Sequence, residues 1–413
     1  MEKKKNTPKL RFPEFTGEWE EKKLGEIADV KTGPFGSILH QHDYVSIGTP
    51  IITVEHLDEL GIVHKNLPLV SEEDKKRLKS YLLEEGDIVF SRVGSVDRNS
   101  LIGPNENGWL FSGRLLRIRF DKEQSTPKFY NIFFQKEESK QKVRSIAVGQ
   151  TMPSINTEIL KSIEIKFPTL PEQTKIATFL TAVDEKLIQL KKKKTFLEQY
   201  KKGVMQKLFS QELRFKDNNN QDFPDWQEKT LGDVASIRSG LSKNQNGNTD
   251  GIKVTRIETI SDGTINTERI GYIDMNVGLE EYKLLKGDIL FSNINSVSHI
   301  GKTAIAFCDL DLYHGMNLLC IRTRKSFDSF FLFYYLNLES IRCYFKSVCN
   351  QAVSQASINQ TELAKTILTT PSLPEQQKIA KLLLSIDDKI DYCGKQIVRM
   401  ESWKKGLLQQ MFI

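Results

Sequence analysis

The sequence predicts an α+β protein with two similar mixed α/β domains, each followed by one long helix of the coiled-coil type. Three observations predict this: a chain of 413 residues, too long for one ordinary core, a long-range repeat, and an apolar heptad pattern at the end of each copy. The apolar content of 39% and the charged content of 27% are ordinary for a globular protein. No apolar run reaches the ~18 residues of a membrane-spanning helix, and the N-terminus has no secretory signal pattern, so we expect a cytoplasmic protein.

The repeat is clearest where LPEQTKIA (170–177) returns as LPEQQKIA (373–380). Over residues 168–209 and 371–412, 18 of 42 positions are identical. Further upstream, WEEKKLGEIADVKTG matches WQEKTLGDVASIRSG, and GDIVFS matches GDILFS. The spacing between matched stretches changes along the chain, which indicates insertions between shared structural elements. The chain is therefore two copies of one module.

Each globular part is predicted to contain short strands that end in glycine turns, followed by an aromatic helix. The strand signals of the first copy are LGEIADVKTG, GDIVFS and GRLLRIRF, and helices are expected at 128–146 and, in the second copy, at 329–345. The aromatic residues of the two helices align as Phe129, Phe133 and Phe134 with Phe330, Tyr334 and Tyr335.

The last part of each copy is predicted to be one helix of about 38 residues, or ~57 Å. Pro171 and Pro374 suit a first helical turn, and apolar residues then recur at alternating spacings of three and four. The alternating positions include Leu180, Leu187, Lys194 and Lys201 in the first helix and Leu383, Ile390, Ile397 and Lys404 in the second. This pattern favours pairing between the two helices, and the alternative is that each helix packs only on its own domain.

Lysines interrupt the apolar stripe near the end of each helix. Lys201 and Lys404 are expected either to set the helix register or to contact acidic groups of another protein. The apolar ends VMQKLF and LLQQMFI are interpreted as surface for partner helices.

The net charge of +6 is located mainly on the two long segments. Residues 171–209 contain nine lysines and four acidic residues, and residues 374–413 contain seven basic and five acidic residues, which leaves the rest of the chain near neutral. This distribution suggests a polyanionic partner near the helices, although a solvated lysine-rich face is the alternative.

Catalytic and metal-binding motifs are scarce. The five cysteines form no Cys-x-x-Cys pair, and the histidines at positions 40, 42, 56 and 64 lack the spacing of a metal site. Gly301-Lys302-Thr303 resembles the end of a P-loop, but Ser296 stands where that motif needs glycine. A binding protein with two different modules fits better than an enzyme.

On the repeated LPEQ segments and the paired LGEIADVKTG and GDIVFS stretches, the whole chain resembles the specificity subunits of type I restriction–modification systems. The resemblance implies two target recognition domains, at 1–168 and 213–370, and two helices, at 169–212 and 371–413, that form an antiparallel coiled coil. It also implies sequence-specific DNA recognition, in which each domain reads one half of an asymmetric bipartite target. The helices would set the spacer and dock methyltransferase subunits. One departure is that Lys194 stands where the second copy has Ile397.

The resemblance further implies a non-catalytic subunit without cofactors of its own. Two methyltransferase subunits and two restriction/translocase subunits are the expected partners, together with double-stranded DNA. These partners would use S-adenosylmethionine, ATP and Mg²⁺ for adenine N6 methylation and ATP-dependent cleavage. The alternative from another functional class is a two-module adaptor that binds proteins and does not read DNA sequence.

Base contacts are expected from Arg, Lys, Asn or Gln side chains at loop tips. The candidates, chosen because they adjoin the shared elements, are Lys31, Arg92, Arg98 and Gln150 in the first domain and Lys243, Asn293, Lys302 and Gln355 in the second. For each of them, a solvated loop residue is the alternative interpretation.

Overall fold

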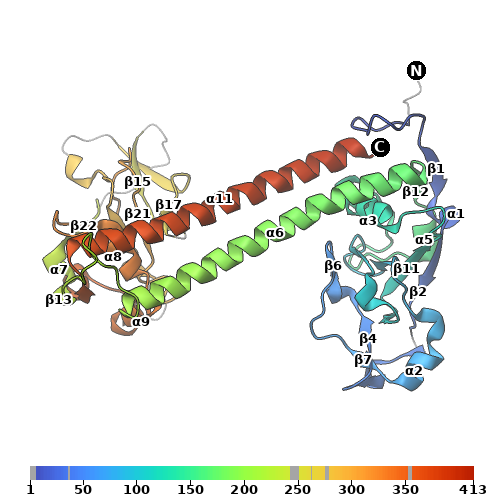
Figure 1. Ribbon diagram of the computed structural model, residues 1–413, viewed down its shortest axis with the longest axis horizontal. Helices are drawn as coiled ribbons and strands as arrows, with labels where there is room; N and C mark the ends of the chain where they lie inside the picture. The colour runs from blue at the N-terminus through green and yellow to red at the C-terminus, as the bar shows by residue number, and fades with distance from the viewer. Residues whose placement is uncertain (1–5, 36–37, 242–250, 262, 275–278, 352–355) are drawn as a thin grey trace. The chain divides into compact units, whose positions relative to one another are not determined.

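The computed structural model describes residues 6–35, 38–241, 251–261, 263–274, 279–351 and 356–413 (Figure 1). The chain forms two compact units: Met1–Lys192 with Gly394–Ile413, and Lys193–Cys393. Each unit therefore contains one globular domain, the start of the long helix that follows it, and the end of the other long helix. Among the described residues, no helix is both long enough and apolar enough to cross a membrane.

The first domain is built on an antiparallel four-stranded sheet in the order β2-β11-β8-β9. A smaller sheet in the order β10-β4-β7-β3, the hairpin β5-β6 and the pair β1-β12 complete it. The strands are β1 (Glu20–Lys23), β2 (Ala28–Thr32), β3 (Tyr44–Val45), β4 (Thr49–Ile52), β5 (Leu57–Asp58), β6 (Gly61–Ile62), β7 (Leu69–Val70), β8 (Ile88–Ser91), β9 (Asn99–Leu101), β10 (Leu110–Phe111), β11 (Leu115–Phe120) and β12 (Glu164–Phe167). The helices are α1 (Leu24–Ile27), α2 (Glu72–Arg77), α3 (Pro127–Gln135), α4 (Glu137–Ile146) and α5 (Thr157–Lys161).

The second domain repeats this order in a sheet β14-β22-β19-β21, which β17 and β16 extend. Three further groups are β15-β18, β20-β24-β23 and β13-β25. The strands are β13 (Gln227–Thr230), β14 (Ala235–Ser239), β15 (Ile252–Thr255), β16 (Ile260–Ser261), β17 (Thr264–Ile265), β18 (Ile270–Ile273), β19 (Ile289–Phe291), β20 (Ile294–Asn295), β21 (Thr303–Ile305), β22 (Leu319–Thr323), β23 (Asn350–Gln351), β24 (Ala356–Ser357) and β25 (Ile367–Thr370). The helices are α7 (Leu231–Val234), α8 (Ser329–Leu336), α9 (Glu339–Val348) and α10 (Gln360–Ala364).

The repeated Gly-Asp pair has the same structural role in both domains. Asp87 is buried before β8, and its carboxylate accepts two hydrogen bonds from Arg119, each 2.7 Å long. Asp288 before β19 accepts 2.6 and 2.5 Å bonds from Arg322 in the same way. The preceding glycines have positive φ, +91° and +86°, a conformation that favours glycine. The turn and the charged pair together fix the entry into the central strand.

The aromatic helices α3 and α8 are equivalent with a one-residue correction to the predicted alignment. Trp19 contacts Phe129 at 5.9 Å between ring centroids, and Trp226 contacts Phe331 at 6.1 Å. Phe129 therefore corresponds to Phe331 and not to Phe330. The offset between the copies is 203 at Arg119 and Arg322 but 202 at the aromatic helices, so the second copy has one residue fewer between strand and helix. The similar run of aromatic letters conceals this change.

The long helices are α6 (Leu170–Phe209) and α11 (Leu373–Met411), of 40 and 39 residues. Both have proline in the first turn, as expected. In the first unit Asp184 contacts Lys404, and Lys191 contacts Glu401 at 2.7 Å, so numbers that rise along α6 fall along α11. The helices are thus paired antiparallel, which confirms the expected coiled coil.

The repeated Pro-Glu-Gln has a structural explanation that the sequence did not reveal. Glu172 and Glu375 are buried, and each carboxylate is bound by an arginine from the segment before a domain. Arg11 donates to Glu172 over 2.8 and 2.7 Å, and Arg214 donates to Glu375 over 3.2 and 2.9 Å. Arg11 and Arg214 are themselves 203 residues apart, so the duplication includes this contact.

The glutamine of the same motif ties the helix start to the domain. Gln173 accepts a 3.0 Å hydrogen bond from the Thr126 amide before α3. Gln376 accepts a 2.9 Å bond from the Asp328 amide before α8. The motif is therefore the junction between domain and helix.

The ends of the long helices are buried in the domain cores, so their interpretation as surface for partner helices is wrong. Phe412 is 3% exposed and stacks on Phe129 at 5.1 Å in the first unit. Phe209 packs on Phe331 at 5.4 Å in the second unit. Burying one such side chain stabilises a fold by about 1.5–3 kcal/mol. Each core therefore includes the start of one long helix and the end of the other.

Candidate nucleic-acid interface

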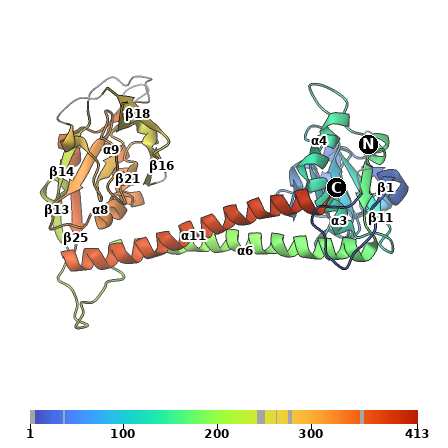
Figure 2. The same ribbon diagram turned by 90° about the horizontal axis from the view of Figure 1, so that it is seen from above.

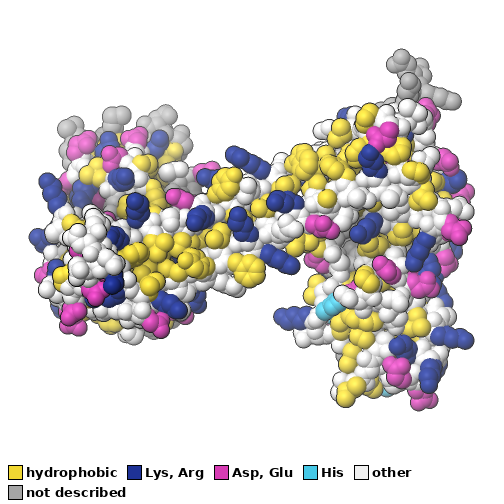
Figure 3. All heavy atoms as spheres, viewed as in Figure 1, with side chains coloured by type: hydrophobic (Ala, Val, Ile, Leu, Met, Phe, Trp, Pro, Cys, Tyr) yellow, Lys and Arg dark blue, Asp and Glu magenta, His cyan; other side chains and the backbone are white. Residues whose placement is uncertain are grey.

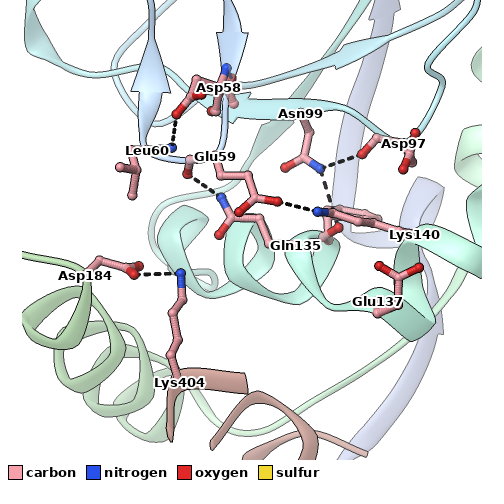
Figure 4. Close-up of polar contacts among 12 residues, drawn as sticks. Asp58, Glu59, Leu60, Asp97, Asn99, Gln135, Glu137, Lys140, Asp184 and Lys404 are labelled. Carbon is pink, nitrogen blue, oxygen red and sulfur yellow. Dashed lines mark hydrogen bonds and ion pairs between the residues drawn. The ribbon is translucent and has the colours of Figure 1, made fainter. Parts of the chain in front are cut away.

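Two ion pairs link the long helices at equivalent places, one in each unit. Lys404 Nζ lies 2.6 Å from Asp184 Oδ1 (Figure 4). Lys201 Nζ lies 2.6 Å from Asp387 Oδ1. Both lysines and both aspartates are related by the repeat spacing of 203 residues. Of the two expected roles for these lysines, the structure supports register setting within the chain.

The second ion pair has an additional partner. The Tyr334 hydroxyl donates a 2.6 Å hydrogen bond to Asp387, and the Lys201 ammonium lies 5.1 Å from the Tyr334 ring centroid. Burial raises the pKa of Tyr334 above its usual range, and the hydrogen bond to Asp387 acts in the same direction. The two helix contacts are thus equivalent in position but not in composition.

The other predicted stripe residues differ in burial. Leu180, Leu187 and Leu383 are buried, whereas Ile390 and Ile397 are half-buried. Lys194 lies 3.5 Å from Glu198 on its own helix. Lys194, which stands where the second copy has Ile397, is therefore paired with a carboxylate one turn further along α6.

Four segments of the first domain converge at one place, which we call the first loop cluster: residues 33–35, 92–95, 112–114 and 147–154. The Arg92 amide donates to Arg114 O over 2.8 Å, and Gly94 N donates to Pro153 O over 2.8 Å. Val93 and Val148 each form a β-bridge with Ser154. Main-chain contacts therefore hold the four segments together.

Glycine allows the closest approach within the first loop cluster. A Cβ atom on Gly33 would lie 2.2 Å from Ser112 O, and one on Gly113 would lie 2.5 Å from the Phe35 Cβ. The glycine turn predicted from Lys31-Thr32-Gly33 thus has a packing reason.

Two DNA-contact candidates lie in this cluster. The Arg92 guanidinium donates to Gly113 O over 3.3 Å and lies 5.4 Å from the Phe35 ring centroid, where it stays half-exposed. Gln150 is exposed in the turn after Gly149. Their positions suit base contacts, and the contacts themselves stay a prediction.

Lys31 and Arg98 each make a side-chain contact within the domain, but only Lys31 lies in a strand. Lys31 is in β2, where its ammonium donates to Ser80 O over 2.9 Å and lies over the Tyr81 ring at 4.4 Å. Burial lowers the pKa of Lys31, and the charge of Arg117 adds to this effect. The Arg98 guanidinium donates to Leu57 O in the hairpin β5-β6. The expected loop-tip position is wrong for Lys31, whose side chain is held by a local acceptor. Arg98 is exposed in the loop before β9, and its DNA contact stays a prediction.

The same hairpin is also held by α3 and α4 (Figure 4). Gln135 Nε2 donates to Glu59 O over 2.6 Å, and Lys140 pairs with the Glu59 carboxylate. Ser100 on β9 exchanges hydrogen bonds with the main chain of Asp58, 2.9 and 2.7 Å long. This polar network fixes the hairpin that accepts the Arg98 hydrogen bond.

The second domain has an equivalent arrangement, which we call the second loop cluster: residues 240–241, 293–299, 314–316 and 356–358. Leu241 forms a bridge with Gly315, and Ile358 N donates to Asn293 O over 2.9 Å, as Ile155 N does to Arg92 O. The exposed segment 296–299 carries Ser296, Val297, Ser298 and His299.

The second-domain candidates have mixed outcomes. Asn293 is 9% exposed, and its amide donates to Ile358 O over 3.4 Å, so the expected loop-tip position is wrong because the side chain supports the cluster from inside. Lys302 is half-buried directly before β21. Lys243 and Gln355 lie outside the described residues, so their role stays a prediction.

Sequence reasoning missed the apolar members of the first loop cluster. Phe35, Val148 and Met152 are 57%, 62% and 66% exposed. Nothing in the local sequence marks them as surface residues, and only their convergence identifies them as one surface. Among the described residues, no three His, Cys, Asp or Glu side chains are placed to share a metal ion.

Lysine and arginine side chains are also spread over the long helices, as Figure 3 shows on one face of the molecule. They include Lys191, Lys193, Lys202 and Lys395, all of which are exposed. The turned view in Figure 2 shows α6 and α11 side by side. The long helices thus expose positively charged side chains to solvent.

Comparison with known proteins gives a consistent result. The family model described as "Type I restriction modification DNA specificity domain" matches residues 16–199 and 224–401. The putative type I restriction enzyme MjaX specificity subunit of Methanocaldococcus jannaschii is 40% identical over 210 residues, which is 49% of each chain. The MjaVIII specificity subunit of the same organism is 26% identical over 97% of this chain and 92% of the relative.

Two solved structures share the fold. The S subunit of a type I restriction–modification system from M. genitalium has a TM-score of 0.62 at 17% identity and covers 98% of this chain and 99% of its own. A chain from a structure of type I R-M complex assembly and conformational transition has a TM-score of 0.57 at 19% identity and covers 95% of this chain and 97% of its own. Because the family model matches well over half of the chain, in two copies, the chain belongs to the family of type I restriction modification DNA specificity domains, and its function is sequence-specific DNA recognition.

Proposed function

We propose that this chain is the specificity subunit of a type I restriction–modification complex and that it reads an asymmetric bipartite DNA target. Residues 1–168 and 213–370 are the two target recognition domains, and each reads one half-site through its loop cluster. The observation that carries the proposal is the matched pair of helix contacts, Lys404–Asp184 and Lys201–Asp387. They make the chain a fused equivalent of a two-fold dimer, and such dimers bind two half-sites at a set spacing.

The long helices set the unread spacer between the half-sites. Each helix is uninterrupted over about 40 residues, and equivalent ion pairs hold the same register in both units. Adding or removing whole turns of both helices would therefore change the spacer length while leaving the bases that are read unchanged.

The helices also dock the methyltransferase subunits. Tyr200 and Trp403 occupy equivalent positions and are 57% and 48% exposed. Exposed aromatic side chains at matched positions suit two copies of one partner. Two restriction/translocase subunits then join through the methyltransferases.

Catalysis and cofactors belong to these partners in the proposal. S-adenosylmethionine supplies the methyl group, and ATP and Mg²⁺ support translocation and cleavage. This chain selects the DNA site, and it binds the target so that the methyltransferase subunits can reach its bases.

Methylome sequencing of the host with this gene present and deleted tests the proposal. We expect one bipartite motif with methylated adenine in both halves to disappear on deletion. A purified complex with methyltransferase that shows no preference for any duplex would favour the protein-binding adaptor instead.

A further inference from the structure

The first loop cluster combines exposed apolar side chains with positive charge. Phe35, Val148 and Met152 are each more than half exposed, so they contribute little to the domain core. The same four segments contain Arg92 and Arg114 and no Asp or Glu. A site for a polyanion favours arginines and excludes carboxylates. An apolar site for a protein partner has neither requirement, so this composition favours a polyanion.

The apolar groups are held in fixed main-chain settings. Val148 and Val93 are both bridged to Ser154, and Gly149 has φ +101° in the turn that presents Met152. Phe35 lies against Gly113 and under the Arg92 guanidinium. The three exposed side chains therefore lie on segments that main-chain contacts hold together.

The second domain differs at the same positions. In the sequence, Phe35 aligns with Ser242. Val148, which is bridged to Ser154, corresponds to Asn350, which pairs with Ser357, so both matched positions are polar in sequence. A structural requirement of the fold would apply to both copies. At the two positions that can be matched, the sequence of the second copy is thus polar, as expected of a feature that distinguishes one half-site from the other.

In the major groove, the C5 methyl group of thymine is the apolar group that a side chain can contact. We propose that Val148 and Met152, with Phe35 beside them, recognise thymine methyl groups in the half-site read by the first domain. This inference rests on the proposed function and adds the chemical class that one domain selects.

Deoxyuridine tests it, because this base pairs as thymine does but lacks the methyl group. The full chain in complex with its methyltransferase is titrated with the mapped target duplex and with two duplexes in which the thymines of one half-site are replaced by deoxyuridine. We expect replacement in one half-site to weaken binding by about fourfold per contacted methyl, the value that burial of one methyl group implies.

The double variant Val148→Ala, Met152→Ala should lose this sensitivity in that half-site and bind both duplexes equally. Met152→Leu, which keeps an apolar side chain, should retain it. Leu60→Ala is the matched control, since Leu60 is 55% exposed in the turn of the β5-β6 hairpin, outside the cluster. Replacement in the other half-site should affect the wild type and the double variant equally.

Equal sensitivity of the wild type and the double variant would overturn the inference, and so would a wild type indifferent to deoxyuridine in both half-sites. A complex that binds no duplex selectively would overturn the proposed function, and the inference with it. Binding of the unsubstituted target duplex in the same titration shows whether the complex is selective, and so separates these outcomes.

Discussion

Arg92 and Asn293 occupy the same place in the two domains, just beyond β8 and β19, and their carbonyl groups accept the same 2.9 Å hydrogen bond from an isoleucine amide. Their side chains nevertheless do different things. Arg92 is half-exposed beside Phe35, and Asn293 is buried against Ile358. The duplicated main chain is a scaffold, and the side chains placed on it have diverged.

The difference extends over both loop clusters. The first offers arginine and apolar side chains, which suit guanine edges and thymine methyl groups. The second exposes Ser296, Ser298 and His299, which suit hydrogen bonding to base edges. An asymmetric target follows from two copies of one scaffold with different surface chemistry.

The largest expected effect is a loss of stability when the buried Arg–Glu pair that both units share is broken. Arg11→Ala and Arg214→Ala each leave a buried glutamate, Glu172 at 1% and Glu375 at 0% exposure, without its partner. Loss of one partner of a buried pair costs about 3–5 kcal/mol. We expect the two variants to lose similar amounts of unfolding free energy, each in its own unit. Urea unfolding monitored by hydrogen exchange measures the loss in each unit.

Lys365→Ala is the control for these variants, because its pair with Glu362 is exposed and contributes at most ~0.5 kcal/mol. A large loss for one arginine variant and none for the other would break the equivalence of the two helix junctions.

A pH dependence should separate the units. His314 is buried, donates from Nε2 to Leu318 O over 2.9 Å, and has its pKa lowered by burial to about 4. The neutral form is favoured in the folded state, so its contribution is complete above the unfolded pKa of about 6.5 and is lost as the pH falls toward 4. We expect the second unit to lose about 3 kcal/mol over this window.

The first domain has Phe111 at the corresponding position, which cannot titrate. His314→Phe should therefore flatten the pH dependence of the second unit between pH 6.5 and 4, measured by urea unfolding at each pH. An unchanged slope in this variant would assign the effect to other groups.

The helix contacts provide a finer test. Asp387 accepts hydrogen bonds from Lys201 and Tyr334, whereas Asp184 pairs with Lys404 without a tyrosine. We expect Asp387→Asn to cost about 2 kcal/mol and Asp184→Asn about 1 kcal/mol. In a Tyr334→Phe background the two costs should become equal, which a double-mutant cycle measures directly. A difference that persists without the hydroxyl would rule out this explanation.

How far the sequence predicts this molecule depends on the range of the contacts. The repeated motifs and the apolar stripes with their lysines can each be read within a short stretch of sequence, and they predicted the coiled coil correctly. The pairing of Arg11 with Glu172 spans 161 residues, and no periodicity indicates it. The grouping of Phe35 with residues 147–154 likewise depends on the folded sheet, so the chosen candidates included buried Asn293 and omitted exposed Met152.

The smallest expected effects return to Arg92 and Asn293. Arg92→Ala removes a half-exposed cation from a carboxylate-free surface, so we expect about tenfold weaker DNA binding, a salt dependence reduced by about one unit of slope, and unchanged unfolding. Asn293→Ala removes a buried hydrogen bond, so we expect about 1 kcal/mol of destabilisation and unchanged affinity. DNA titrations at several salt concentrations, together with urea unfolding of both variants, measure each of these quantities. If Asn293→Ala weakened DNA binding as Arg92→Ala does, the equivalent positions would share a function, and the divergence inferred from their side chains would be wrong.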